Sequence, residues 1–153
     1  PAADTDHTGP LAFDISTLPA GGRMTVSLHG RPVFIAHRSE AEIEAARMTP
    51  LEELTFPERD ADRARLARWL VLDGICPDSR KFRLIAMGQR DGWSRGEYGG
   101  WFCSRAGAHF DTSGRLRKGI GRNMKALPYR ITEDGRILIP RVPARFWRLQ
   151  QSH

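Results

Sequence analysis

The sequence predicts an all-β fold of antiparallel sheets with one or two short helices. Short runs of strand-forming residues alternate with turn residues along most of the chain. Two dipeptides, His29-Gly30 and Asp134-Gly135, lie between such runs and are typical of β-hairpin turns, the second of a type I′ turn. The segment Ser39 to Glu42 combines the residue types that begin a helix.

The first half of the chain contains three predicted strands and two predicted helices. The strands are Leu11–Ile15, Met24–Leu28 and Pro32–Ala36, and His29-Gly30 joins the last two. Ser39 and Glu42 form a capping box, which predicts a helix over Ala41–Arg47. The charged stretch Glu58–Arg68 after Pro57 predicts a second helix with Leu66 and Trp69 facing inward.

The second half predicts further short strands around two loops. A buried strand begins at Trp69 and is followed by a turn over 73–79. The later predicted strands are 83–87, 99–103, 109–112, 127–132 and 136–140. Phe146 and Trp147 are expected to pack on the sheet.

The composition indicates a single domain without a membrane span. A chain of 153 residues buries enough apolar surface to fold without disulfides or metals. No run approaches the roughly 20 apolar residues of a transmembrane helix. Residues 1–10 are expected to be a flexible arm, and a chain that begins with Pro leaves room for an anchor removed upstream.

The positive charge of the chain is concentrated in its second half. Between Arg80 and Lys125, eleven basic residues face three acidic ones, whereas the rest of the chain is mildly acidic. Such a region either keeps the protein soluble or binds an anionic partner. Interspersed glycines and the lack of a basic helix argue against nucleic acid as the partner.

The two cysteines, Cys76 and Cys103, allow one disulfide but no disulfide scaffold. Each follows a hydrophobic strand and begins a turn. Two equivalent loops that each offer a cysteine are one way to build a shared metal site.

From about Leu11 to Pro140 the sequence resembles the Rieske iron–sulfur subunits of cytochrome bc complexes. The resemblance rests on the segments 30–43, 69–71, 99–103 and 109–119, of which the last two are the most specific. It implies Rieske-type antiparallel sheets, with a base domain at 11–72 and 124–153 and an inserted cluster-binding-like subdomain at 73–123.

The resemblance also implies a ligand site that differs from the family's. Such proteins hold a [2Fe–2S] cluster through a Cys-x-His and a Cys-x-x-His loop. Here Cys76 and Cys103 match the cysteines, but Asp78 and Ala106 replace the histidines. The family's second cysteine pair corresponds to Lys81 and Arg105. We therefore expect no cofactor and no metal.

Alternatives to this expectation remain open. An atypical [2Fe–2S] centre or a zinc site formed by Cys76, Asp78, Cys103 and His109 would make the chain an electron-transfer subunit or a metal protein. Because the family's two cysteines bind one iron, we expect a Cys76–Cys103 disulfide when the metal is absent. A thiol–disulfide redox module is the weakest alternative, because the sequence has no Cys-x-x-Cys motif.

The expected function is that of a structural, accessory or regulatory partner of a respiratory cytochrome bc-type complex, without activity of its own. Its location would be the periplasmic side of the bacterial inner membrane or the mitochondrial intermembrane equivalent. A cationic tip would contact subunits of the membrane complex, another acidic protein surface or anionic lipid headgroups. The tip residues are Arg80, Lys81, Arg83, Arg105 and Arg122.

Overall fold

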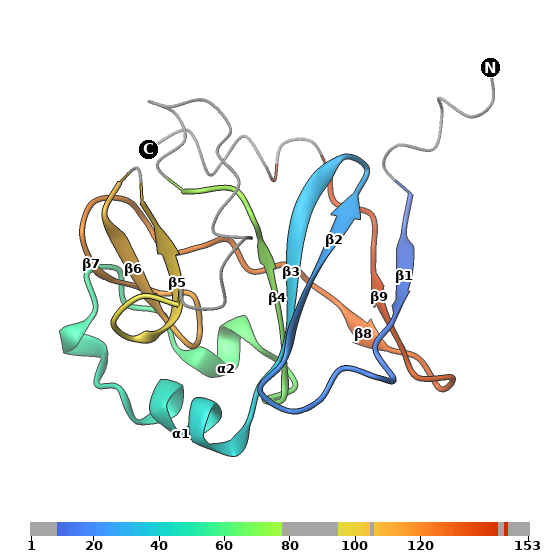
Figure 1. Cartoon of the computed structure of the whole chain (residues 1–153), viewed down its shortest axis with the longest axis horizontal. Helices are drawn as coiled ribbons and strands as arrows, with labels where there is room; N and C mark the ends of the chain where they lie inside the picture. The colour runs from blue at the N-terminus through green and yellow to red at the C-terminus, as the bar shows by residue number, and fades with distance from the viewer. Residues whose placement is uncertain (1–8, 78–94, 105, 144–145, 147–153) are drawn as a thin grey trace.

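The predicted all-β class is confirmed by the structure, a computed structural model that describes residues 9–77, 95–104, 106–143 and 146. The described part contains three antiparallel three-stranded sheets and two short α-helices (Figure 1). The strands are β1 (Leu11–Asp14), β2 (Arg23–Leu28), β3 (Arg31–His37), β4 (Trp69–Asp73), β5 (Gly99–Cys103), β6 (Ala108–Asp111), β7 (Leu116–Lys118), β8 (Arg130–Ile131) and β9 (Arg136–Ile139). The helices are α1 (Glu40–Met48), the 3-10 turn η2 (Leu51–Glu53) and α2 (Asp60–Arg63).

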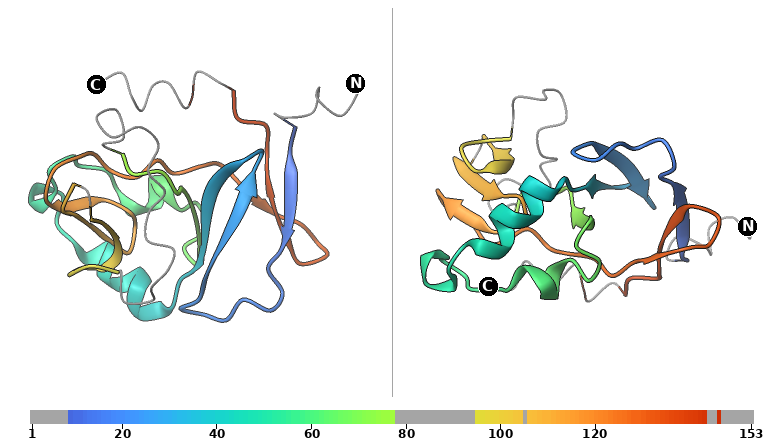
Figure 2. Two further views of the ribbon diagram at one scale, coloured as in Figure 1. Left: turned by 45° about the horizontal axis from the view of Figure 1, so that its top comes forward. Right: turned by 90° about the horizontal axis from the view of Figure 1, so that it is seen from below.

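The sheets have the strand orders β1-β9-β8, β2-β3-β4 and β5-β6-β7. One apolar core, which includes Ile35, Val71 and Ile137, joins the first two sheets. A second core, which includes Phe34, Leu72 and Phe110, joins the β2-β3-β4 sheet to β5-β6-β7. Neighbouring residues of β3 and β4 therefore serve both cores, because successive side chains of a strand point to opposite faces. Figure 2 shows the helices along one side of the molecule.

The two predicted hairpins both form, but through different turns. His29 and Gly30 both have positive φ, 54° and 89°, as a two-residue type I′ turn requires. At the second hairpin only Gly135 has positive φ, and its N–H donates to the Thr132 carbonyl at 3.2 Å. The predicted type I′ turn at Asp134-Gly135 is therefore wrong, because a longer loop with a left-handed glycine closes β8 onto β9.

Helix α1 begins as predicted. The Ser39 hydroxyl accepts from the Glu42 N–H at 3.2 Å, and the Glu42 carboxylate accepts from the Ser39 N–H at 2.9 Å. This reciprocal pair satisfies two backbone donors that a helix start otherwise leaves open.

The second predicted helix is much shorter than expected. Helix α2 ends at Arg63, and the Leu66 side chain is 48% exposed, so its inward orientation was wrong. Tyr129 Oη accepts from the Leu66 N–H at 3.1 Å, and Arg38 Nε donates to the Ala67 carbonyl at 2.8 Å. These contacts with distant residues replace the helical hydrogen bonds beyond α2.

Other predictions had mixed outcomes. Strand β7 was not predicted, although it pairs with β6 through His109 and Lys118. Phe146 packs against the first core, as expected of the tail. The predicted strand at 83–87 and Trp147 lie outside the described residues.

Buried arginines join the helices to the turn between β6 and β7. Arg38 forms a double hydrogen bond with Asp60, at 2.7 and 2.9 Å, and both side chains are 1% exposed. Arg63 donates to the Ser113 and Met124 carbonyls, and Arg115 to those of Glu58 and Ala46. These contacts fix the β5-β6-β7 sheet, which carries Cys103, against α1 and α2.

The Asp60 carboxylate keeps its charge despite burial. Burial alone raises the pKa of Asp60, but the hydrogen bonds and charge of Arg38, together with a hydrogen bond from Arg47, hold that pKa below its usual value. The folded state therefore holds Asp60 ionised.

Candidate functional site

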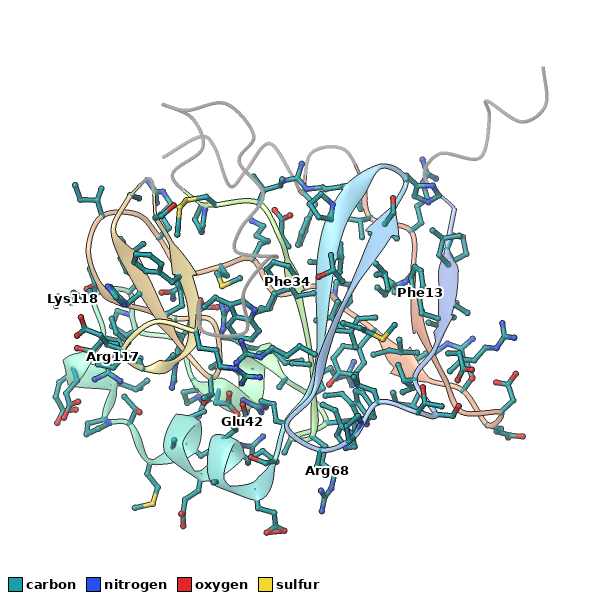
Figure 3. All side chains as sticks on the ribbon, viewed as in Figure 1. Phe13, Phe34, Glu42, Arg68, Arg117 and Lys118 are labelled. Atoms are coloured by element: carbon teal, nitrogen blue, oxygen red, sulfur yellow. A yellow bond between two sulfur atoms is a disulfide. The ribbon has the colours of Figure 1, made fainter. Side chains whose placement is uncertain are left out.

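The two cysteines lie at the ends of strands from different sheets. Cys76 follows β4 after Gly74 and Ile75, and Cys103 is the last residue of β5. Both are buried, at 0% and 2% exposure, and they are joined in a disulfide with a Cα–Cα distance of 6.2 Å. The expected disulfide is present, and the sulfur–sulfur bond appears near the top of Figure 3. It links segments that are 27 residues apart.

Apolar groups enclose the disulfide. Cys76 and Cys103 belong to the second core, together with Trp101, Ala108 and Leu116, and Ala106 packs against this core. Such surroundings exclude water from the sulfur atoms and disfavour a thiolate. The site is therefore a dry structural link in this structure.

Glycines hold the neighbouring loops close together. A Cβ atom at Gly119 would overlap the Gly107 carbonyl oxygen, and φ at Gly119 is 93°. Only glycine fits this contact without a shift of the backbone. The segment after β7 therefore lies directly against the loop that follows Cys103.

The described residues do not fit the family's [2Fe–2S] cluster. A disulfide and thiolate binding of iron are mutually exclusive for the same two cysteines. Ala106 has no side-chain atom that can bind a metal, and Asp78 lies outside the described residues. Within the described ranges, no group of three or more His, Cys, Asp or Glu side chains could hold a metal ion.

His109 lies on a different face of its sheet from Cys103. The register of β5 and β6 pairs Cys103 with Ala108 and Phe102 with His109. Since successive side chains alternate between faces, His109 lies on the Phe102 face, where the two rings are 4.6 Å apart. The structure thus does not bring His109 to the cysteine pair of the alternative metal site.

His109 belongs instead to a small polar cluster. Its Nδ1 accepts from the Glu97 N–H at 3.1 Å. Lys118 Nζ is 3.0 Å from the Glu97 carboxylate, and this hydrogen bond lowers the pKa of Glu97. The His109 Nε2 atom is 3.9 Å from the same carboxylate.

Sequence reasoning missed Arg23, which holds strand β5 in place. Its guanidinium donates to the carbonyls of Gly99, at 2.8 Å, and Gly100, and lies 3.9 Å from the centroid of the Trp101 ring. Burial, and then the nearby charge of Arg95, lower the pKa of Arg23 to about 9. No local pattern could identify this contact, because Arg23 lies more than 70 residues from Gly99 and Gly100 in the sequence.

The predicted cationic tip is described only at Arg122. Arg80, Lys81, Arg83 and Arg105 lie outside the described residues. The Arg122 guanidinium is 6.0 Å from the Phe56 ring, and Lys125 Nζ is 4.7 Å from the Phe146 ring. These four side chains line a cleft of about 540 Å³, in which burial lowers the pKa of Lys125.

No described helix has the length and apolar character that crossing a membrane requires.

Comparison with known proteins gives similarity over most of the chain. No family model matches the sequence. The chain is similar to the ubiquinol–cytochrome c reductase iron–sulfur subunit of Rhodospirillum rubrum, with 39% identity over 140 residues, 91% of this chain and 75% of that protein. It is also similar to the mitochondrial cytochrome b-c1 complex subunit Rieske of Neurospora crassa, at 37% identity, and of Schizosaccharomyces pombe, at 36%. Those alignments cover 90% of this chain and 57% of each fungal protein.

These relatives correct one expectation from the sequence. We expected no cofactor, but the relatives are Rieske iron–sulfur subunits, and this relationship points to an iron–sulfur cofactor. The expectation was wrong because it weighed the residues that serve the cluster in the family and not the similarity of the whole chain to iron–sulfur subunits. The similarity extends over about 90% of the chain, and the all-β fold agrees with it. The chain belongs to the family of Rieske iron–sulfur subunits of ubiquinol–cytochrome c reductase.

Proposed function

We propose that this chain is a subunit of a ubiquinol–cytochrome c reductase-type membrane complex, in which it has a structural or accessory role. The observation that carries the proposal is the disulfide between the two loops that correspond to the family's ligand loops. Family membership supports the assembly, because the Rhodospirillum rubrum relative is named as a subunit of that enzyme.

The proposed domain organisation follows from the family resemblance. Residues 11–72 and 124–153 form the base, and residues 73–123 form the insert that carries both cysteines. In the proposed role, the disulfide ties the first loop, after β4, to the second loop, after β5. The buried arginines add a second connection, because Arg63 and Arg115 reach between the helices and the turn after β6.

A cationic tip gives the proposed subunit its contact with the complex. Its residues are positively charged in the sequence, and a positive surface recognises an acidic surface on a partner subunit. The proposed location is the periplasmic side of the membrane, or the intermembrane side in mitochondria. Anionic lipid headgroups would favour the same orientation.

Electron transfer is the second candidate function, and the names of the relatives favour it. It requires reduced Cys76 and Cys103 and other ligands in place of the two histidines. Asp78 is a candidate oxygen ligand from the sequence. A cluster with this ligand set would differ in reduction potential from the family's, because the two histidines on one iron raise that potential.

Two measurements on the tagged protein test the proposal. Purification from membranes under mild detergent is expected to recover subunits of a cytochrome bc-type complex; purification of the chain alone would contradict the proposal. Iron content, visible absorption and the reduced-state EPR signal are then measured on anaerobically prepared protein. A signal that is present in the wild type and lost in Cys76→Ser/Cys103→Ser would establish the second candidate.

A further inference from the structure

A small pocket lies between the two α-helices, far from the disulfide. Its volume is about 270 Å³, and its walls are the end of α1, the start of η2 and the first residues of α2. The two helices lie in the lower part of Figure 1, whereas the disulfide lies near the top of the same view in Figure 3. Pockets for drug-sized ligands measure roughly 300–1,000 Å³, so this one suits a smaller ligand.

Four charged side chains line the pocket, and three of them are positive. They are Arg47, Arg59, Arg115 and Asp60. The charge of Arg115 is balanced outside the pocket, because its Nε donates to the buried Asp111 carboxylate at 2.9 Å. Arg59 lies 3.3 Å from Asp62, but both side chains are mostly exposed, so water and salt weaken this pair.

Arg47 shares its carboxylate partner with a second arginine. The two Asp60 oxygens accept from Arg38 at 2.7 and 2.9 Å, and Oδ2 also accepts from Arg47 Nε at 3.0 Å. Arg38 and Asp60 are each 1% exposed, whereas the Arg47 side chain is 40% exposed. Two guanidinium groups thus meet one carboxylate, and the excess positive charge lies on the exposed side, at Arg47.

Neighbouring glutamates do not cancel this excess. Glu53 and Glu58 pair with other arginines, at 3.2 and 2.8 Å. Within the described part of the chain, Glu44 and Glu52 form no ion pair, and neither of them lines the pocket. The pocket therefore has a positive lining although acidic residues are common in the surrounding segment.

The terminal nitrogens of Arg47 and Arg59 have no acceptor among the described residues. Each side chain donates through Nε alone, Arg47 to Asp60 and Arg59 to Asp62. Since a guanidinium has five N–H groups, most of the donors of both arginines are available to a ligand. The two arginines belong to different elements, because Arg47 lies in α1 and Arg59 immediately precedes α2.

We propose that this pocket binds a phosphate group, with Arg47 as the main ligand residue and Arg59 as the second. A phosphomonoester carries almost two negative charges and three acceptor oxygens near neutral pH. Guanidinium groups match such oxygens through paired hydrogen bonds. A carboxylate has one charge and two oxygens in one plane, so it would leave donors of the second arginine unused. Inorganic phosphate and a phospholipid headgroup offer the same chemistry, and the test separates them.

The test titrates the isotope-labelled full chain with sodium phosphate and, separately, with sodium acetate at matched ionic strength. Amide chemical shifts locate the site and give the dissociation constant. We expect saturable shifts at 46–51 and 59–61 with phosphate, and binding of acetate that is about tenfold weaker. Thermal unfolding is a second readout, because a ligand of the folded state raises the melting temperature.

Four variants test the donors. Arg47→Gln is expected to weaken phosphate binding about tenfold and Arg59→Gln about threefold, because each removes a guanidinium group. Arg47→Lys keeps the charge but loses the paired donors, so it should weaken binding several-fold. Arg136→Gln is the matched control: it removes one charge from a 54% exposed side chain of β9, and binding should not change. Unfolding without phosphate verifies that each variant folds, and Arg59→Gln still decides the test if Arg47→Gln is unstable.

Vesicles distinguish the two sources of the phosphate group. Phosphatidic acid in phosphatidylcholine presents a phosphomonoester headgroup, and pure phosphatidylcholine is the blank. Sedimentation with phosphatidic acid that Arg47→Gln reduces and Arg136→Gln does not would assign the pocket to a lipid headgroup. Saturable binding of inorganic phosphate without such sedimentation would assign it to a soluble phosphate compound.

Three outcomes would overturn the proposal. The first is the lack of a saturable response to both phosphate and phosphatidic acid vesicles. The second is acetate binding as tight as phosphate binding, which would make a carboxylate of an acidic partner the occupant. The third is an equal loss in Arg47→Gln and Arg136→Gln, or unchanged binding by Arg47→Lys; the net charge of +6, and not the pocket, would then attract the anion. None of these outcomes affects co-purification with the membrane complex, which tests the proposed function separately.

Discussion

Removal of the Cys76–Cys103 disulfide is expected to lower the free energy of unfolding substantially. The bond closes a loop between positions 27 residues apart, so it restricts the unfolded chain as well as the folded loops. The loop-closure relation gives about 3.5 kcal/mol at 25 °C for a loop of this length. For a chain of this size, that loss corresponds to a decrease of roughly 10 °C in the melting temperature.

Urea unfolding, followed by tryptophan fluorescence, measures this effect. The oxidised wild type is compared with the dithiothreitol-reduced wild type and with Cys76→Ala/Cys103→Ala. Reduction should shift the wild-type midpoint to that of the variant, while dithiothreitol should leave the variant unchanged. Titration of free thiols before unfolding should find none in the oxidised protein, because both cysteines are in the bond.

Two results would refute this reasoning. A difference below about 1 kcal/mol between the oxidised and reduced forms would show that the bond does not restrict the unfolded chain as the relation requires. Two reactive thiols in the native, unreduced protein would show that the disulfide is not formed.

Four further predictions concern the scaffold. Arg38→Met should lower the free energy of unfolding by about 3–5 kcal/mol in urea melts at pH 7, because it leaves the buried Asp60 carboxylate without its double hydrogen bond. The pKa of Asp60 is lower in the folded state than in the unfolded state. The ionised Asp60 carboxylate therefore stabilises the protein fully above the ordinary aspartate pKa, and this stabilisation is lost as the pH falls through the folded-state pKa. Asp60→Asn should accordingly flatten the acid limb of the curve of unfolding free energy against pH. Gly100→Ala should destabilise the protein by several kcal/mol or prevent folding, because the new Cβ would overlap the β6 backbone. Gly135→Ala has open space around it and should cost about 1–2 kcal/mol from its positive φ alone. Thermal melts of the two variants compare these losses. Ser39→Ala should cost about 1 kcal/mol by loss of the helix cap and Ser39→Gly only a few tenths, and equal losses would contradict the capping role.

Local sequence patterns predicted the elements whose determinants lie close together in the chain. The His29-Gly30 turn needs two residues with positive φ, and the α1 start needs Ser39 and Glu42 three positions apart. The hydrophobic strands that precede the two cysteines were also recognisable from the sequence. Each of these features depends on interactions within a few residues.

Distant contacts decided what the sequence could not. The predicted second helix ended at Arg63 because Tyr129 and Arg38 bind the backbone beyond it. Strand β7 formed although it is only three residues long, since it completes the sheet beside β6. No sequence pattern singled out Arg23, and only the tertiary structure placed it over Trp101.

The candidate site shows the same division. The sequence by itself determined that the chain has two cysteines in two equivalent loops, and that Asp78 and Ala106 stand at the other two positions. Only the tertiary structure decided that the sulfurs meet in a dry core and that His109 lies on the opposite face of the sheet. Residue types are properties of the chain, whereas distances between loops arise from strand pairing and the packing of two cores.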